Sequence, residues 1–164
     1  MVEMHVFGLA LDEKSQSPVL ILKDLADETV LPIWIGAMEA MAISLALNKV
    51  DFPRPMTHDL MLNVLAALGA ELSAVEITRV EEGTFYAELV VRLGDAEKRV
   101  DCRPSDAIAL AVRVEAKVLA ARAVLEQAGT LSSEAPEVVL KSEDADKWAE
   151  ELDKVSPDDF KYEM

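Results

Sequence analysis

The segment that most constrains the fold is VDCRPSDAIALAVRV, at residues 100–114. Its first three residues alternate apolar and polar side chains, which is the period of a β-strand, and an arginine–proline pair then ends that strand. Ser105 follows where an N-cap is expected, with Asp106 in the first turn of a largely apolar helix. Because a helix start presents free N–H groups and partial positive charge, the segment predicts either a plain helix cap or a site for an anion.

Apolar periodicity along the rest of the chain predicts an α+β fold. The expected strands are at 5–12, 19–23, 30–35, 71–80, 84–93 and 97–102, and the expected helices at 38–48, 57–68, 105–115, 116–127 and 143–154. The strand at 30–35 is apolar on both faces, which predicts a central place in the sheet.

Two of the expected helices have apolar side chains at helical spacing. In the helix that Thr57 would cap, this apolar face consists of Leu60, Met61, Val64, Leu65 and Leu68. In the helix expected at 116–127, the predicted buried face consists of Val118, Ala121 and Leu125. The seven methionines of the chain are expected to fill the core.

The same order of elements, three strands followed by two helices, occurs twice, at about 4–69 and 71–129. A shift of 67 residues places Glu39 opposite Asp106, each in the first turn of its helix. Sequence identity between the two segments is low, so the prediction depends on this shared carboxylate and on the order of elements. The sequence therefore predicts an internal duplication of two β3α2-type units that share a mixed or antiparallel sheet.

Length and composition predict one domain at 1–133 and an acidic tail at 134–164, with an amphipathic C-terminal helix at 143–154. A single cysteine excludes an intramolecular disulfide and predicts a reducing compartment. The N-terminus has no basic region of a signal peptide, and a membrane span at the longest apolar run would have to bury Glu39. We therefore expect a cytoplasmic protein that does not cross a membrane.

The net charge of −15 argues against tight, non-specific binding to nucleic acid, which normally uses clustered lysines and arginines. Acidic proteins can still act on nucleic acid where a metal ion or local arginines supply positive charge. The sequence has no phosphate-binding glycine loop, zinc-ligand spacing or nucleophile elbow that would identify another enzyme class.

Seven polar residues near the expected helix starts are candidates for a functional site: Arg54, His58 and Asp59 in one linker, Arg103, Ser105 and Asp106 in the segment above, and Glu39. A carboxylate in an apolar run is costly unless it is paired, so Glu39 is expected to bond its own helix start, an arginine or a metal. A histidine beside Asp59 suits general acid–base catalysis or metal binding. Arginines held extended before proline suit either phosphate or a carboxylate partner.

Three motifs, LPIWIGAMEAMAISLAL, RPMTHDLM and CRPSDAIALAVR, together resemble the bifunctional nuclease domain family. The ending SPDDFKYEM is similar to the C-terminus of bacterial members. The resemblance implies an α+β fold of two β3α2-type units and nuclease activity on RNA and DNA. It implies no assignment of catalytic residues.

These observations support two main hypotheses. In the first, the protein is a metal-assisted phosphodiesterase acting on RNA or DNA. Its catalytic residues would be Glu39, His58, Asp59 and Asp106, with Mg²⁺ or Mn²⁺ held by Glu39 and Asp106 and the phosphate bound by Arg54, Arg103 and Ser105. In the second, the protein is a non-enzymatic scaffold in which the same residues form a salt-bridge network. A weaker third possibility is a module that binds small anions. Exposed edge strands and the apolar tail helix predict a homodimer.

Overall fold

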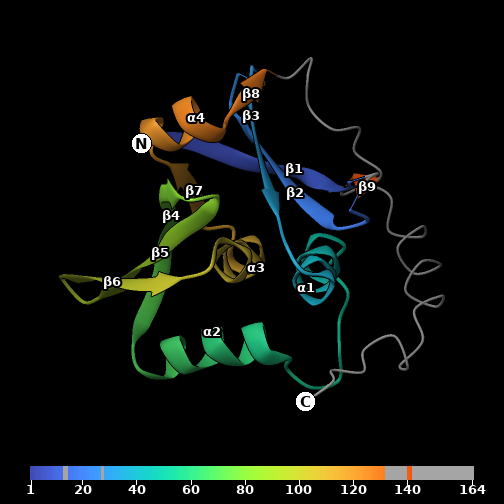
Figure 1. Cartoon of the computed structure of the whole chain (residues 1–164). Coiled ribbons are helices and arrows are strands. Elements are labelled where there is room, and N and C mark those ends of the chain that lie inside the picture. The colour runs from blue at the N-terminus through green and yellow to red at the C-terminus, as the bar shows by residue number, and fades with distance from the viewer. Residues whose placement is uncertain (13–14, 27, 132–139, 142–164) are drawn as a thin grey trace.

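The computed structural model describes residues 1–12, 15–26, 28–131 and 140–141 (Figure 1). The first half of the chain has three antiparallel strands and two helices: β1 (Val2–Leu11), β2 (Pro18–Asp24), β3 (Thr29–Trp34), α1 (Ala37–Leu47) and α2 (Thr57–Ala67). The second half begins in the same way, with three antiparallel strands and a helix: β4 (Ala70–Glu81), β5 (Thr84–Leu93), β6 (Ala96–Cys102) and α3 (Pro104–Val114). The α+β class and these nine elements confirm the prediction, with boundaries shifted by up to three residues.

The remaining elements join the two halves into one mixed sheet. They are β7 (Lys117–Ala120), α4 (Arg122–Ala128), β8 (Thr130–Leu131) and β9 (Leu140–Lys141). The strand order is β6-β5-β4-β7-β1-β2-β3-β8, and β9 pairs with β1. β7 lies between the two halves, parallel to β4 and antiparallel to β1. The sheet is therefore continuous only because of this four-residue strand.

The helix predicted at 116–127 is wrong in its first half and is confirmed in its second half, where α4 lies. Glu115, with a left-handed φ of 54°, ends α3, and the next residues form β7 instead. The pairing of β7 with strands on both sides outweighs the helix propensity of an alanine- and leucine-rich segment. Val118 and Ala120 become buried within the sheet, and Ala121 becomes the N-cap of α4.

The order of elements therefore differs between the halves, because β7 separates α3 from α4. The duplication stays a prediction. The strand predicted to be central, β3, in fact lies beside the two-residue β8 at one end of the sheet. Its side chains are nevertheless buried on both faces, since Leu31 and Ile33 join the main core and Val30 joins a smaller cluster.

Helices α1 and α3 lie side by side next to the sheet (Figure 1). α3 packs on β4 and β5, and α1 packs on β2, so the main core fills the space between helices and strands. Its largest fully buried side chains include Leu20, Leu22, Leu31, Ile43, Ile77 and Ile108. This packing fixes the starts of the two helices relative to each other.

Helix α2 is attached less closely. Only Leu62 and Leu65 pack against the core, while most of the predicted apolar face is between 42% and 69% exposed: Leu60, Met61, Val64 and Leu68. The apolar pattern of α2 therefore does not mark a buried face in this chain. Gly69, at φ +73°, ends the helix in the left-handed conformation expected of a glycine at that position.

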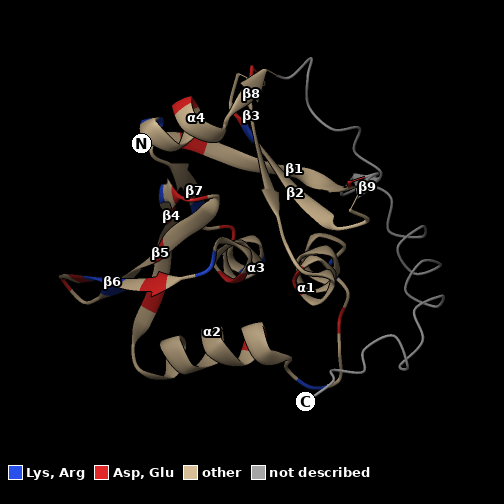
Figure 2. Ribbon diagram, viewed as in Figure 1, with Lys and Arg blue, Asp and Glu red and all other residues tan. Residues whose placement is uncertain are grey.

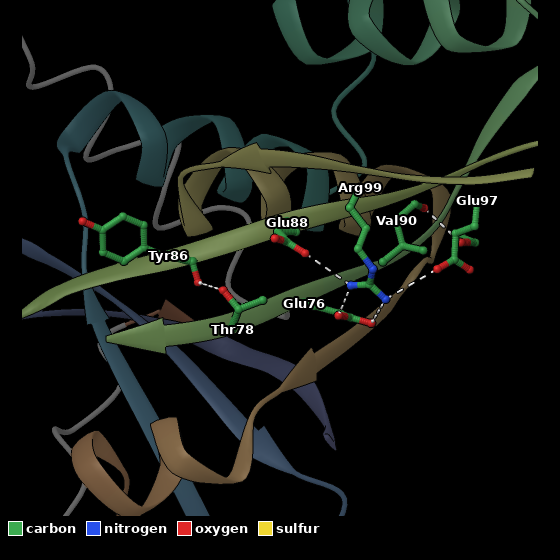
Figure 3. Close-up of polar contacts among 8 residues, drawn as sticks. Glu76, Thr78, Tyr86, Glu88, Val90, Glu97 and Arg99 are labelled. Atoms are coloured by element: carbon green, nitrogen blue, oxygen red, sulfur yellow. Dashed lines mark hydrogen bonds and ion pairs between the residues drawn. The ribbon is translucent and has the colours of Figure 1, made fainter. Parts of the chain in front are cut away.

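Ion pairs cover part of the strands β4 to β6 (Figure 3). Arg99 lies among three carboxylates, paired closely with Glu76 and at 3.3 Å and 3.5 Å from Glu88 and Glu97. Its own side chain is 46% exposed, so solvent screens these ion pairs. Acidic residues are spread over strands and helices of the described chain (Figure 2).

The tail helix predicted at 143–154 lies outside the described residues. Within the part of the chain that is described, no helix combines the length and hydropathy that a membrane crossing requires.

Candidate functional site

The starts of α1, α2 and α3 meet at a cavity of about 800 Å³. The beginning of β5 and the end of β6 complete its wall. Four of the seven predicted site residues line it: Glu39, His58, Arg103 and Asp106. They come from three helix starts that are far apart in the sequence, and the packing of α1 against α3 brings two of these starts together.

Arg103 connects two of these helices. Its Nε and Nη2 donate to Asp106 at 2.7 Å and 3.1 Å, a bidentate contact, and its Nη1 donates to Glu39 Oε1 at 2.8 Å. Asp106, followed by Glu39, raises the pKa of Arg103 above its already high value. The predicted pairing of Glu39 with an arginine is therefore the alternative that the structure shows.

The backbone also holds Arg103 in place. Arg103 is the N-cap of α3 with extended backbone angles of −75° and 145°, and Pro104 occupies the first helical position. Despite its three hydrogen bonds, the Arg103 side chain is 66% exposed. The guanidinium is thus fixed in orientation and still open to solvent.

His58 lies in the first turn of α2, on the side of the cavity that α2 provides. Its Nε2 is 3.6 Å from Asp106 Oδ1, and the two side chains are 16% and 29% exposed. Asp106 therefore faces both Arg103 and His58. An imidazole close to a carboxylate is an arrangement that suits proton transfer.

Arg113, in the last turn of α3, is a site residue that sequence reasoning missed. It donates to Asp59 Oδ1 at 2.7 Å, to the carbonyl of Ala42 at 3.2 Å and to the carbonyl of Ala109 at 2.6 Å. These partners belong to α2, α1 and α3, so one side chain that is only 11% exposed links all three helices. The signal in the sequence was a single cation in an otherwise apolar helix, which needs a partner when the helix is buried.

Asp59 is bound by Arg113 and does not line the cavity. One of its oxygens accepts from Arg113, and the other accepts from the backbone N–H of Met56 at 2.9 Å, which caps α2. Although partial burial acts to raise it, the hydrogen bonds from Arg113 and Met56 hold the pKa of the Asp59 carboxyl below its usual value. The geometry gives Asp59 a structural role.

Two predicted substrate-binding residues lie elsewhere. Arg54 is exposed in the linker before α2 and does not line the cavity. Ser105 is not the N-cap of α3, because Arg103 holds that place and the helix begins at Pro104. Ser105 is instead buried, at 6% exposure, on the inner side of the helix start.

Gly36, the N-cap of α1, lies directly against the carboxylate of Glu39. A Cβ at this position would overlap Glu39 Oε2, whereas the backbone angles of Gly36 are ones that any residue adopts. The absence of a side chain at Gly36 therefore leaves room for the Glu39 carboxylate beside Arg103.

Cys102 also lines the cavity. Burial, with a contribution from Asp101, raises the pKa of its thiol to about 11. The thiol is protonated near neutral pH, so Cys102 is a poor nucleophile in this site.

The residues that line the cavity do not form a ready metal site. Across the described ranges, no group of three or more His, Cys, Asp and Glu side chains is placed to hold one ion. The two carboxylates predicted to bind a metal, Glu39 and Asp106, both accept hydrogen bonds from Arg103. A divalent cation between them would have to displace the guanidinium.

Comparison with known proteins shows the family of this chain. The family model described as the bifunctional nuclease domain matches residues 20–133. The chain therefore belongs to the bifunctional nuclease domain family, as the motifs predict. The four predicted site residues that line the cavity lie within the matched region.

Individual relatives fall into two groups. An uncharacterized protein of Mycobacterium tuberculosis is 43% identical over 165 residues, which cover 98% of this chain and 99% of the relative. Bifunctional nuclease 1 of Arabidopsis thaliana is 31% identical over 65% of this chain, and bifunctional nuclease 2 of Oryza sativa subsp. japonica is 28% identical over 77% of it. These alignments cover only 34% and 40% of the two plant proteins.

Proposed function

We propose that this chain is a phosphodiesterase that cleaves RNA or DNA, with the reacting phosphate bound by Arg103. The observation that carries the proposal is a guanidinium held by three hydrogen bonds that is nevertheless 66% exposed. An exposed ion pair contributes little to folding, so its fixed orientation is better explained by a ligand. The names of the plant relatives support nuclease chemistry.

The hydrogen bonds of Arg103 leave room for a phosphate. Among its contacts with described residues, one N–H of Nε, one of Nη1 and one of Nη2 are used. A guanidinium has five N–H groups, so one remains on each terminal nitrogen. These two can donate to two non-bridging oxygens of one phosphate. Glu39 and Asp106 then act as positioning residues for Arg103.

His58 is the proposed general base. Asp106 faces Nε2 of the imidazole, which leaves Nδ1 to accept a proton from an attacking water. The water oxygen forms a bond to phosphorus, the bond to the leaving oxygen breaks, and the leaving oxygen takes a proton from solvent. Arg103 stabilises the negative charge that develops on the phosphate oxygens.

The metal requirement remains a separate part of the proposal. Mg²⁺ or Mn²⁺ would supply Lewis-acid chemistry at the phosphate. The present arrangement of Glu39 and Asp106 around Arg103 does not fit such an ion, so no step above is assigned to it. An assay with added Mg²⁺ or Mn²⁺, compared with one in EDTA, tests this requirement directly.

The experiment that tests the function is an assay of the full chain and His58→Asn on labelled RNA and DNA, with both proteins purified identically. We expect His58→Asn to lower the cleavage rate by about 10²-fold or more, because a general base contributes on the order of 10²–10⁴-fold. Thermal unfolding of both proteins serves as a control for folding. Cleavage that survives unchanged in His58→Asn would show that the activity comes from a contaminant or from another site.

A second variant tests the positioning of Arg103 without removing a charge. In Gly36→Ala the new methyl group should displace the flexible Glu39 carboxylate at little cost in stability. We expect on the order of a tenfold loss of cleavage rate, because small displacements of positioning groups are costly in catalysis. Glu39→Gln should give a similar loss, and the double variant should give no further loss. If the losses of cleavage rate add in the double variant, the two substitutions do not both act through the position of the Glu39 carboxylate.

The non-enzymatic hypothesis has one observation in its favour, since Glu39, Asp106, Asp59 and Arg113 are all paired with one another or with Arg103. In that case the network would serve stability alone. The two hypotheses differ in whether loss of Arg103, the most exposed residue of this network, affects cleavage or stability.

A further inference from the structure

We propose that the cavity beside Arg103 binds one unpaired nucleobase, so that the substrate is single-stranded. This inference rests on the proposed function, because it places the base of the nucleotide whose phosphate Arg103 binds. Two kinds of side chain line the cavity. The ion-paired residues described above are polar, and six others are apolar and together are called the apolar wall: Met38, Met41, Leu45, Met56, Met61 and Phe85.

The apolar wall is rich in methionine. Four of the seven methionines of the chain line this cavity, and three of them are strongly exposed: Met38 at 49%, Met56 at 39% and Met61 at 42%. The prediction that the methionines fill the core is therefore wrong for these residues. Methionine side chains are flexible and polarizable, and they make favourable contacts with aromatic rings. Exposed methionines gathered at one cavity are typical of a surface that re-packs around its ligand.

The residues of this wall come from elements that also carry the polar groups. Met38, Met41 and Leu45 share the face of α1 whose first turn holds Glu39, while Met56 and Met61 flank His58 on α2. Phe85 adds an aromatic ring from β5. A volume of about 800 Å³ lies in the range of pockets that enclose a small organic ligand. One nucleotide can therefore place its phosphate at Arg103 and its base against the apolar wall.

The charge distribution explains why a base contact is needed. Three carboxylates line the cavity, from Glu39, Asp101 and Asp106, against the guanidinium groups of Arg103 and Arg113. Arg113 is already bound to Asp59. A chain of net charge −15 with this cavity offers few contacts to a row of phosphates, which is the usual source of affinity for duplex nucleic acid. Stacking of an unpaired base supplies affinity without added positive charge.

The test is equilibrium binding, measured by fluorescence anisotropy with phosphorothioate oligonucleotides that resist cleavage. Three probes are compared: a single-stranded hexanucleotide, the same backbone with abasic sugars, and a longer hairpin of the same chemistry whose stem is a six-base-pair duplex. We expect the abasic strand to bind about tenfold more weakly than the normal strand and the duplex to bind no better than the abasic strand, because stacking is lost in both. Equal binding of the normal and abasic strands would overturn the proposal.

Matched variants on α2 locate the contact. Met56→Ser with Met61→Ser removes two exposed cavity residues, and Val64→Ser with Leu68→Ser removes two exposed apolar residues that do not line the cavity. We expect the first pair to weaken single-strand binding by about tenfold and the second to leave it unchanged. Equal effects of both pairs would overturn the proposal. So would a concentration-dependent dimer that only the methionine pair abolishes, because these methionines would then form a subunit interface.

The outcomes separate this inference from the proposed function. Base-dependent binding without any cleavage supports the subsite and contradicts the phosphodiesterase. Cleavage that proceeds equally on single strands, duplexes and abasic substrates supports the phosphodiesterase and overturns the subsite.

Discussion

Replacing Arg103 by alanine is expected to abolish nucleic-acid cleavage while lowering the free energy of unfolding by no more than about 1 kcal/mol. The small effect on stability follows from the 66% exposure of the side chain, because solvent screens its ion pairs with Glu39 and Asp106. The large effect on activity follows from the loss of the only described cavity guanidinium that is not already bound to Asp59. Cleavage assays and urea unfolding of the same preparation measure the two effects.

Arg103→Lys is the informative companion variant. Lysine keeps the charge but cannot donate to Asp106 and Glu39 and also present two N–H groups to a phosphate. We therefore expect Arg103→Lys to fold normally and to remain severely impaired in cleavage. Full activity in Arg103→Ala would contradict its role in binding the phosphate. No cleavage by the unmodified chain, together with a loss of several kcal/mol in the stability of Arg103→Ala, would favour the non-enzymatic hypothesis.

Replacing Arg113 by methionine is expected to lower the free energy of unfolding by about 2–4 kcal/mol. Methionine fills a similar volume, so the loss comes from the contacts of the guanidinium with Asp59, Ala42 and Ala109. These contacts are poorly hydrated, since Arg113 is only 11% exposed, and the groups left behind lose their hydrogen-bond partner. Urea unfolding monitored by circular dichroism measures the change.

The matched control is Arg92→Met. Arg92 pairs with Glu71 on the surface of β4 and β5, where both side chains are 60% exposed, so its loss should change stability by less than about 1 kcal/mol. Equal losses in Arg92→Met and Arg113→Met would contradict the proposal that Arg113 holds the three helices together.

The dependence of stability on acid pH provides a second check of the pairing between Arg113 and Asp59. The pKa of Asp59 is lowered on folding, so its contribution is present above the unfolded value of 3.8 and is lost as the pH falls through the lower folded value.

The sequence predicted well those features that depend on local pattern. Alternation predicted the strands β4 to β6, and the proline after Arg103 predicted where α3 begins to within one residue. The alignment of Glu39 with Asp106 also identified the two carboxylates that share one arginine. The packing of α1 against α3, which brings these two first turns together, came only from the structure.

Features that depend on partners distant in the chain could not be predicted in this way. The roles of Arg113 and Asp59 are set by the packing of α2 beside α3, which no local pattern indicates. β7 is a strand because β1 and β4 flank it, and its four residues are compatible with a helix when taken alone. In the sequence, the exposed methionines cannot be told apart from methionines of the core, and only the structure places them at the cavity.

The position of β7 also affects how the chain can fold during synthesis. The edge of β1 at Val2–Met4 and the edge of β4 at Ala74–Ile77 both pair with residues 117–120. Until those residues leave the ribosome, two sheets with unpaired backbone edges coexist in one nascent chain, and such edges favour association with other chains. The two halves are therefore not separable modules, and a product that ends before residue 117 would be prone to aggregate.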